Sequence, residues 1–362
     1  MAQALRVGMI GVNAERGWAR EGHVPAVQAL EGLELVAVAT RRQASADAAA
    51  AATGAARAYG DPADLIADPG VDVVTVAASV PAHRDLVLTA LAAGKHVVTE
   101  WPLGIDAEQS DEIAAAAAAS ALHTAVGLQA RVNPAVRAAR EAIASGRIGR
   151  VLNATVLSTT AGFGPEVGQD ALSLEDPATG MNLTTIQHAH TLDLAVELVG
   201  PLTSVAGLST IQFPQLDVAG RTEAYRRTVA DHVLVHARLA GGGALAVQVA
   251  GGYPPERCPF HLEVVGTGGR LVLRGGSPRG FQAGVLALEI DGEAVEVDPG
   301  QSAGLPDPVV NVAHLYAALR DDVATGSTTA PSFAHAARLA HLVDDVLASA
   351  ADGRTRPVQD AS

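Results

Sequence analysis

The first third of the chain alternates short runs of apolar, often β-branched residues with longer segments that mix apolar and polar residues. The short runs are typical of buried strands, and the mixed segments are typical of amphipathic helices. This alternation predicts a parallel sheet with helices on both faces, which defines a doubly wound α/β domain. Strands are expected at residues 5–10, 33–39, 71–77, 96–99 and 123–128, and helices at residues 23–31, 45–53, 62–67, 81–93 and 107–121.

The hydrophobic pattern changes after Gln129. A helix over residues 133–145 is followed by segments in which apolar and polar residues alternate, and glycine-rich links join several of them. This alternation predicts strands paired as hairpins, and therefore a second, α+β domain with an open, mostly antiparallel sheet. The clearest strands are expected at residues 151–159, 232–239, 244–250, 261–265 and 270–274.

Three more helices and one long loop are expected in the second half. Helices at residues 190–198, 309–324 and 333–351 are expected to cover one face of the second sheet. Residues 161–179 are rich in glycine and proline without periodicity, so they are expected to form a loop near the site. The length of 362 residues suits two domains, which are expected at residues 1–128 and 129–362.

Charge and cysteine content reduce the number of function classes that the chain could belong to. The 25 Lys and Arg residues and 39 Asp and Glu residues give a net charge of -14, which repels nucleic acid and anionic membrane surfaces. The single cysteine, Cys258, excludes an internal disulfide and a cysteine-rich metal site. The sequence lacks an apolar run long enough to span a bilayer and the pattern of a signal peptide. A cytoplasmic protein is expected.

A turn suited to a dinucleotide follows the first strand. In residues 11–19, glycines would let backbone N–H groups approach a pyrophosphate at the start of the next helix. A strict G-x-G-x-x-G motif is absent, because Asn13 replaces its second glycine and the next glycine is Gly17. Asparagine tolerates a left-handed backbone better than most residues, so the turn remains feasible. An ordinary strand–helix turn without a ligand is the alternative.

The end of the second strand indicates which dinucleotide would bind. In this kind of fold an acidic residue there accepts the ribose hydroxyls of NAD, whereas an arginine accommodates the 2′-phosphate of NADP. Thr40, Arg41 and Arg42 follow the strand without a carboxylate. The pattern favours NADP, with NAD as the second candidate. Two solvated arginines at a helix start are the alternative interpretation.

Eight short motifs occur in one order along nearly the whole chain. They are Val7-Gly8-Met9-Ile10-Gly11, His23-x-Pro25-Ala26, Ser79-x-Pro81-x-His83, Ala93-Gly94-Lys95-His96-Val97, Glu100-Trp101-Pro102-Leu103, Ser145-Gly146-x-Ile148-Gly149, His190-Thr191-Leu192-Asp193 and Val265-Gly266-Thr267-Gly268-Gly269. In this order and spacing the chain resembles the Gfo/Idh/MocA oxidoreductase family. The resemblance implies an N-terminal Rossmann domain, a C-terminal α/β domain, bound NAD(P), and sugars, cyclitols or related polyols as substrates.

The turn, the second strand and the resemblance together give the candidate site. His190 is the candidate acid–base residue, and Asp193 lies at a helical spacing that would let it orient His190. The candidates for substrate binding are Arg131, Asn182 and His190. The candidates for cofactor binding are Gly11, Asn13, Gly17, Trp18, Thr40, Arg41, Arg42, Ser79, His83, Glu100, Trp101 and Gln129.

Two positions depart from the family pattern. The family usually carries Glu-Lys-Pro where this chain has Glu100-Trp101-Pro102, and an aspartate where this chain has Ile186. Neither tryptophan nor isoleucine can exchange a proton with a substrate oxygen. The Glu-Trp pair and the turn with Asn13, Gly17 and Trp18 are similar to the galactose-pathway repressor subgroup of the same family, which binds NADP and contacts a transcriptional activator.

Two hypotheses from different classes follow. The first is an NADP-preferring oxidoreductase that moves hydride between nicotinamide and a sugar-like or other small carbonyl or alcohol substrate. The second is a catalytically silent NADP-binding regulator that contacts a protein partner. By analogy with the family, a homodimer or homotetramer through the exposed face of the second sheet is also expected.

For the His188 and His190 pair, for Arg131 and for Lys95, a structural interpretation stands beside the functional one. His188 and His190 are two residues apart and poorly share one face of a strand or helix, so no metal site is expected. Arg131 is either a ligand for a carboxylate, phosphate or sugar, or one member of a domain-joining ion pair. Lys95 is the only lysine and stands just before a strand, where the family also has lysine, so it is interpreted as structural.

Overall fold

The computed structural model describes residues 4–358, which form two compact units. The first unit contains the described residues up to Val132 together with Gly300–Ala337. The second contains Asn133–Pro299 together with the described residues from Arg338 onward. The observed units therefore differ from the expected ranges 1–128 and 129–362, because a segment far along the chain returns to complete the first unit.

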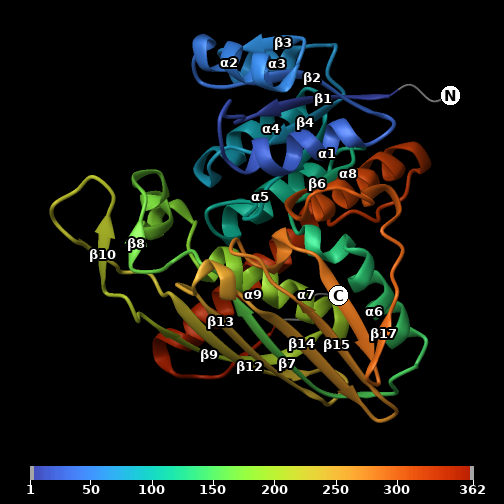
Figure 1. The fold of residues 1–362 in the computed structure, drawn as a ribbon. Helices are drawn as coiled ribbons and strands as arrows, with labels where there is room; N and C mark the ends of the chain where they lie inside the picture. The colour runs from blue at the N-terminus through green and yellow to red at the C-terminus, as the bar shows by residue number, and fades with distance from the viewer. Residues whose placement is uncertain (1–3, 359–362) are drawn as a thin grey trace. The chain divides into compact units, whose positions relative to one another are not determined.

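The first unit is built on six parallel strands in the order β3-β2-β1-β4-β5-β6 (Figure 1). The strand order reverses between β1 and β4, which is where dinucleotides bind in doubly wound folds. The predicted parallel sheet is confirmed, although the pattern did not predict β3. The strands are β1 (Leu5–Ile10), β2 (Leu33–Ala39), β3 (Arg57–Tyr59), β4 (Val73–Val76), β5 (His96–Thr99) and β6 (Thr124–Val126).

Helices of the first unit begin and end at residues that satisfy open backbone groups. Asp61 and Asp106 cap α3 and α5 by accepting hydrogen bonds from backbone N–H groups. Helix α2 ends at Gly54 in the left-handed conformation that glycine favours. The helical segments are the π-helix η1 (Ala19–His23), α1 (Val24–Ala29), α2 (Gln43–Thr53), α3 (Pro62–Ala67), η2 (Val80–Ala82), α4 (His83–Ala92), α5 (Ala107–Ala118), η3 (Gln129–Val132), η9 (Gly300–Ser302) and α8 (Asp307–Thr325).

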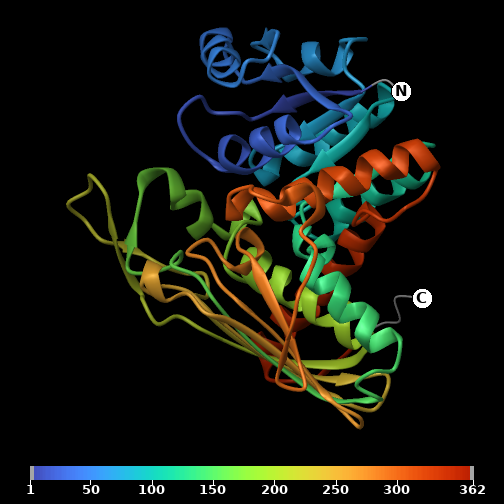
Figure 2. The ribbon, with the colours of Figure 1, turned by 45° about the vertical axis from the view of Figure 1, so that its right-hand side comes forward.

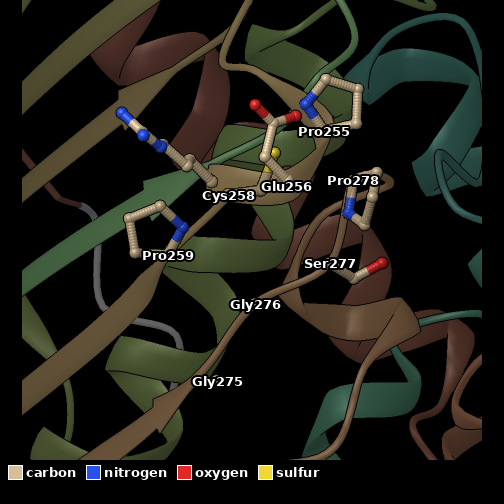
Figure 3. A pocket seen from close by; sticks show the side chains of 9 residues that line it. Pro255, Glu256, Cys258, Pro259, Gly275, Gly276, Ser277 and Pro278 are labelled. Carbon is tan, nitrogen blue, oxygen red and sulfur yellow. The ribbon is translucent and has the colours of Figure 1, made fainter.

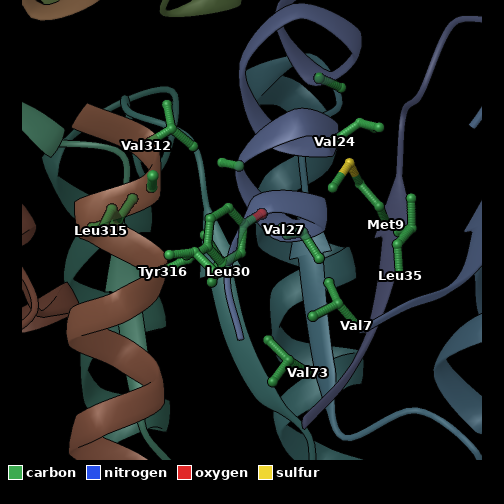
Figure 4. Close-up of a cluster of buried hydrophobic side chains, with 14 of the residues drawn as sticks. Val7, Met9, Val24, Val27, Leu30, Leu35, Val73, Val312, Leu315 and Tyr316 are labelled. Carbon is green, nitrogen blue, oxygen red and sulfur yellow. The ribbon is translucent and has the colours of Figure 1, made fainter. Parts of the chain in front are cut away.

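Helix α8 corrects one expectation. Residues 309–324 were expected to cover the second sheet, but α8 packs against α1, η1, η3 and β6 of the first unit. It adds buried side chains to the core around α1 (Figure 4), namely Val309, Val312, Leu315, Tyr316 and Leu319. An apolar face indicates that a helix is buried but does not identify the surface that buries it, so the pattern placed this helix in the wrong domain.

The second unit is built on nine strands in the order β17-β16-β15-β14-β7-β13-β12-β9-β18. Every pair is antiparallel except β13 with β7, so the predicted open, mostly antiparallel sheet is confirmed. The strands are β7 (Val151–Thr159), β9 (Leu202–Thr210), β12 (His232–Leu239), β13 (Ala244–Ala250), β14 (Phe260–Gly266), β15 (Arg270–Gly275), β16 (Leu286–Ile290), β17 (Glu293–Val295) and β18 (Arg356–Pro357).

Helices cover one face of this sheet (Figure 2). Helix α6 (Pro134–Ala144) packs on β15 and β16, and α7 (Ala189–Val199) packs on β7 and β13. Helix α9 (Phe333–Asp352) contacts β9, where Gly207 N donates to Ser349 Oγ at 2.9 Å. On the other face, side chains such as Leu208 and His236 are exposed. Among the helices of residues 4–358, none is long and apolar enough to cross a membrane.

A buried ionic cluster anchors the segment that was expected to be a loop, residues 161–179. The fully buried Arg227 guanidinium donates to Glu175 at 2.7 and 2.8 Å, to Asp231 at 3.0 Å and to the Phe163 carbonyl oxygen at 2.7 Å. Removing one partner of such a cluster leaves a buried charge uncompensated, so it fixes the segment firmly. The segment contains β8 (Glu166–Val167), η4 (Gln169–Glu175) and η5 (Pro177–Thr179), and β8 joins a small sheet with β10 (Gln215–Val218) and β11 (Tyr225–Arg226).

One carboxylate organises the turn after α8. Asp322 is 2% exposed and accepts hydrogen bonds from Thr329 N, Ala330 N, Ser327 Oγ and Thr329 Oγ1 at 2.7 to 2.9 Å. Burial alone raises the pKa of Asp322, but these hydrogen bonds stabilise the ionised form, and the pKa lies below its ordinary value. Asp322 therefore holds the connection between α8 and α9 in shape.

We expect Asp322→Asn to lower the free energy of unfolding by about 2 kcal/mol near neutral pH, because an amide cannot accept all of these hydrogen bonds. Because the folded-state pKa is depressed, the stabilisation is present above the unfolded-state pKa of about 3.9 and is lost as pH falls through the folded-state pKa. Urea unfolding of both proteins should therefore differ at neutral pH and converge in acid. Asp321→Asn, at the exposed neighbouring carboxyl, is the matched control, and equal losses in both variants would contradict the prediction.

Candidate functional site

The turn after β1 approaches β4 closely. Gly11 has a φ of 96°, and a Cβ at this position would lie 2.6 Å from the Ala77 carbonyl oxygen. Glycine suits this backbone because a side chain would be strained and would collide with the end of β4. The predicted Gly11 thus lies where the strand order reverses, and its backbone packs directly against the end of β4.

Asn13 shapes the next part of the turn. Its Oδ1 accepts hydrogen bonds from Glu15 N and Arg16 N at 2.9 and 3.3 Å, which folds the loop as an Asx turn. Gly17 also has a φ of 96°, and apart from its chain neighbours no described atom lies within 4 Å of the place its Cβ would occupy. The turn therefore leaves open space beside Gly17 at the start of the continuous helix formed by η1 and α1. Gly17 N itself donates to Glu21 Oε1 at 3.1 Å, so a pyrophosphate would have to take the place of this carboxylate there.

The residues after β2 leave their positive charges in solvent. Thr40 Oγ1 lies 2.6 Å from Ser45 Oγ and donates to the Arg42 carbonyl oxygen at 2.9 Å, so Thr40 fixes the start of α2. Arg41 and Arg42 are both exposed. This exposure fits a contact with a 2′-phosphate, and it equally fits two solvated arginines.

His83 ties together the loops that follow β4 and β5. Its ring is fully buried, with Nδ1 2.9 Å from the Pro102 carbonyl oxygen and Nε2 3.0 Å from the Ala78 carbonyl oxygen. Burial lowers the pKa of His83, although both carbonyls and the charge of Glu100 act in the other direction. The ring is therefore neutral near pH 7. A neutral ring has one N–H and donates to only one of these two carbonyl oxygens. Its buried position between the two loops suits packing rather than proton exchange with a substrate.

Ser79 and Trp101 follow the same two strands. Ser79 is exposed immediately before η2. Trp101 is 6% exposed and precedes Pro102 through a cis peptide bond. An apolar ring thus occupies the position at which the family pattern has a lysine, so no ammonium group stands here.

A chain of hydrogen bonds links Glu100, which follows β5, to the interior. His23 Nε2 lies 2.8 Å from Glu100 Oε1, and His23 Nδ1 lies 2.9 Å from Tyr316 Oη. Tyr316 Oη in turn lies 2.9 Å from Thr75 Oγ1. His23, Tyr316 and Thr75 are at most 1% exposed, whereas the Glu100 side chain is 20% exposed. Residues of η1, α8, β4 and the end of β5 therefore meet in one buried polar chain.

Sequence reasoning assigned a role to only one member of this chain, Glu100. His23 belongs to the His-x-Pro motif at the start of α1, which could have marked it, and its ring meets the edge of Trp18 at 6.4 Å between centroids. Tyr316 and Thr75 carry no local signal, because their contact joins positions 241 residues apart.

Gln129 and Arg131 follow β6. Gln129 is 3% exposed, and its Oε1 has no hydrogen-bond partner within residues 4–358. A buried oxygen without a partner is costly, so it fits a site that a donor of a ligand completes. Arg131 Nη1 lies 3.1 Å from His335 Nε2 of the same unit. Together with Gly11 and the open space at Gly17, the Gln129 oxygen gives the first unit features that fit a dinucleotide.

The candidate acid–base residues lie on α7 of the second unit. His190 and Asp193 are 5% and 2% exposed, and their spacing places them one turn apart on one side of the helix. Ile186, at the position of the family's aspartate, lies one turn before His190 in the π-helix η6 (Thr184–His188), which continues into α7. An apolar side chain thus takes the place of the carboxylate on this side of the helix.

Asn182 and His188 shape the start of this helix. Asn182 Oδ1 accepts hydrogen bonds from Thr184 N and Thr185 N at 2.9 and 3.1 Å. His188 is fully buried, its Nδ1 lies 3.2 Å from the Thr184 carbonyl oxygen, and burial lowers its pKa to about 4. His188 is therefore neutral. In the part of the chain that the structure describes, no three or more His, Cys, Asp or Glu side chains are grouped to hold a metal ion.

Two other features lie apart from the candidate residues. Lys95 Nζ donates to the carbonyl oxygens of Asp68 and Val71 at 2.8 and 2.7 Å, which confirms its structural interpretation. A surface cavity of about 480 Å³ in the second unit contains none of the candidates (Figure 3). It is lined by Pro255, Glu256, Arg257, Cys258, Pro259, Gly275, Gly276, Ser277 and Pro278.

Comparison with known families matches both halves of the chain. Residues 5–128 match the oxidoreductase family with an NAD-binding Rossmann fold, and residues 134–275 match the C-terminal domain of Gal80p. The six-stranded sheet and the turn after β1 define a protein of the dinucleotide-binding class. More specifically, residues 5–128 form a domain of the Gfo/Idh/MocA oxidoreductase family, and residues 134–275 are similar to the C-terminal domain of Gal80p.

Curated relatives include both an enzyme and a regulator. Dehydrogenase aclE from Aspergillus oryzae is 30% identical over 221 residues, which cover 59% of this chain and 60% of that protein. The galactose/lactose metabolism regulatory protein GAL80 from Saccharomyces cerevisiae is 25% identical over 343 residues, which cover 87% of this chain and 78% of that protein. The aligned region thus spans less than two thirds of the dehydrogenase, and the relatives do not agree on one activity.

Solved structures agree on the fold. A super-repressor mutant of Gal80p from Saccharomyces cerevisiae has a TM-score of 0.87 at 22% identity, and the alignment covers 98% of both chains. Levoglucosan dehydrogenase in complex with NADH and L-sorbose has a TM-score of 0.85 at 22% identity, with 99% of this chain and 100% of that chain covered. The Rossmann sheet followed by an open antiparallel sheet is therefore shared by a regulator and an enzyme.

Proposed function

We propose that this protein is an NADP-dependent oxidoreductase that transfers hydride between nicotinamide and a sugar-like or other small carbonyl or alcohol substrate. The observation that carries the proposal is the turn after β1, where Gly11 brings the backbone against the end of β4 at the reversal of the strand order. The match of residues 5–128 to an NAD-binding oxidoreductase family supports it. When bound, the nicotinamide supplies or accepts the hydride.

The first unit would hold the cofactor. Within the turn, Asn13 Oδ1 accepts from Glu15 N and Arg16 N, and Gly17 N donates to Glu21 Oε1 at 3.1 Å. The pyrophosphate would bind other backbone N–H groups of the turn up to Trp18 and would replace Glu21 at Gly17 N. Arg41 and Arg42 would bind the 2′-phosphate of NADP, and the buried Gln129 oxygen would accept a hydrogen bond. NAD is the alternative cofactor, in which case both arginines remain solvated.

The arginines after β2 give the first test. We expect the protein to bind NADP more tightly than NAD by about tenfold or more, since each charge-assisted contact with a phosphate contributes about 1.5–3 kcal/mol. Arg41→Ala with Arg42→Ala should remove most of that difference in a calorimetric titration. Arg84→Ala, at an exposed arginine paired with Glu112, is the control. Equal affinities in the unaltered protein would contradict the NADP preference, and no affinity for either coenzyme would contradict the dinucleotide site.

His190 is the proposed acid–base residue. Hydride transfer to or from a carbonyl needs a proton donor or acceptor near the substrate oxygen, and imidazole titrates in the useful range. Asp193 is proposed to orient His190 from the next turn of α7. Arg131 and Asn182 are proposed to bind the substrate. Asn182 would do so mainly through its amide nitrogen, because its oxygen already accepts two backbone hydrogen bonds.

Turnover tests the role of His190. A panel of sugars, cyclitols and small carbonyl compounds, followed at the NADPH absorbance band, should reveal a substrate for the unaltered protein. We expect His190→Ala to lower kcat by about 10²–10⁴-fold, the usual contribution of a general acid or base. His341→Ala, at an exposed histidine on α9, is the control. Undiminished turnover in His190→Ala would remove His190 from this role.

A second candidate function is a catalytically silent NADP-binding regulator that contacts a protein partner. The observations that favour it are the apolar side chains of Trp101 and Ile186 at the two positions where the family pattern has lysine and aspartate. The match of residues 134–275 to the Gal80p C-terminal domain supports the same function. Coenzyme binding without turnover of any substrate, together with one stoichiometric partner whose affinity depends on NADP, would favour it. Clear turnover without such a partner would contradict it.

We also propose that copies of the chain assemble in the cytoplasm as a homodimer or homotetramer through the uncovered face of the second sheet. Leu208, which is 55% exposed on that face, lies directly opposite the partly buried Leu234 of β12. Burial of this apolar pair between copies would be favourable, which supports the proposal. Light scattering during size exclusion should give a mass of two or four chains. Leu208→Asp should shift the mass toward one chain, whereas Leu347→Asp, at an exposed leucine of α9, should not. A monomer of the unaltered protein would contradict the proposal.

A further inference from the structure

The chain of hydrogen bonds from Glu100 through His23 and Tyr316 to Thr75 lies in apolar surroundings. The first unit buries mainly aliphatic side chains around α1 and α8, yet four polar side chains meet there through distances of 2.8 to 2.9 Å. Buried polar groups cost free energy unless their hydrogen bonds are complete. The two ring nitrogens of His23 and the hydroxyl of Tyr316 each have hydrogen-bond partners, so this chain of hydrogen bonds is an ordered part of the core.

The hydrogen bonds between these four side chains all run in one direction, from Thr75 toward Glu100. Burial raises the pKa of Tyr316 far above its ordinary value, with the charge of Glu100 adding to it, so the phenol stays protonated. A carboxylate only accepts hydrogen bonds, so His23 Nε2 carries a proton and donates to Glu100 Oε1. With Nδ1 of the same ring as the acceptor, Tyr316 donates to His23 Nδ1 and Thr75 donates to Tyr316 Oη.

The far end of the chain does not reach solvent. Thr75 is 0% exposed, and Tyr316 and His23 are as deeply buried. The chain therefore cannot deliver protons from outside, and its effect is to fix the tautomer of His23 and one oxygen of Glu100. Glu100 is the member that is partly exposed, and it follows β5 at the carboxyl edge of the sheet, where ligands bind in this fold.

The charge at this edge differs from that of the family pattern. Glu100 is followed by Trp101, so no neighbouring lysine offsets its negative charge. The oxidised nicotinamide ring is cationic, and the reduced ring is neutral. A fixed carboxylate in a partly buried place therefore discriminates between the two forms more strongly than it would in water.

We propose that His23 and Tyr316 are positioning residues that orient the Glu100 side chain toward the bound coenzyme, so that the site selects the oxidised over the reduced nicotinamide. The inference rests on the proposed coenzyme site, but it does not depend on catalysis. It applies equally to an enzyme and to a regulator that senses the oxidised coenzyme.

The test measures the ratio of the dissociation constants of NADPH and NADP⁺ for the full chain and its variants. We expect Glu100→Gln to lower this ratio by about tenfold and Tyr316→Phe to lower it by about threefold, since one removes the charge and the other only its orientation. Tyr59→Phe removes a tyrosine hydrogen bond of 2.8 Å to Asp68 in the same unit, and should leave the ratio unchanged. A variant that is partly unfolded loses both affinities equally, so the ratio still reports on the site.

Nitrogen-15 NMR of the histidine rings gives an independent readout. The His23 signals should show a proton on Nε2 and an accepting Nδ1 in the unaltered protein, and Tyr316→Phe should shift the Nδ1 signal. An unchanged ratio in Glu100→Gln would overturn the selection of the oxidised form, while the coenzyme site would stand. A changed ratio in Glu100→Gln alone, with none in Tyr316→Phe, would overturn the positioning role. No binding of either form would overturn the coenzyme site and this inference with it.

Discussion

The packing of α8 against α1 is the contact on which the first unit depends. The apolar side chains of α8 close the core over Val24 and Val27, which lie on the helix that follows the dinucleotide turn, and over Leu30 just after that helix. The same helix brings the Tyr316 hydroxyl to His23. One helix from far along the chain therefore supplies both the cover for the turn's helix and the hydrogen bond that orients a polar side chain inside it.

The candidate site combines a preserved scaffold with altered chemistry. The close approach of Gly11 to Ala77 and the open space at Gly17 are backbone features, so they tolerate the loss of a strict glycine motif as long as Asn13 folds the loop. The side chains at the candidate positions, in contrast, depart from the family pattern. Trp101 in the first unit and Ile186 in the second occupy positions where the family pattern has lysine and aspartate. Within its own unit, each altered position has a polar side chain near it in the sequence, Glu100 in the first and His190 in the second.

Strong periodicity made most of the two sheets predictable. Strands β1, β2, β5, β7, β12 and β13 begin and end at the expected residues, because buried runs or strict alternation marked them. Strand β9 was missed because small and polar residues such as Thr203, Ser204 and Gly207 blur its alternation, and β8, β10 and β11 are too short to show one. In the site, local motifs identified Gly11 and Gly17. The partnership of His23 with Tyr316 joins positions 293 residues apart, a distance over which no pattern within one sequence carries information.

The discontinuity of the first unit has a consequence for biosynthesis. Domains usually fold as units in the order in which they leave the ribosome. Here the Rossmann sheet of the nascent chain cannot bury helix α1 under α8 until translation has passed Ala337. By that point almost all strands of the second sheet have already been synthesised. The first unit therefore completes its folding late in synthesis. A polypeptide that ended before α8 would leave the apolar side chains of α1 exposed to solvent.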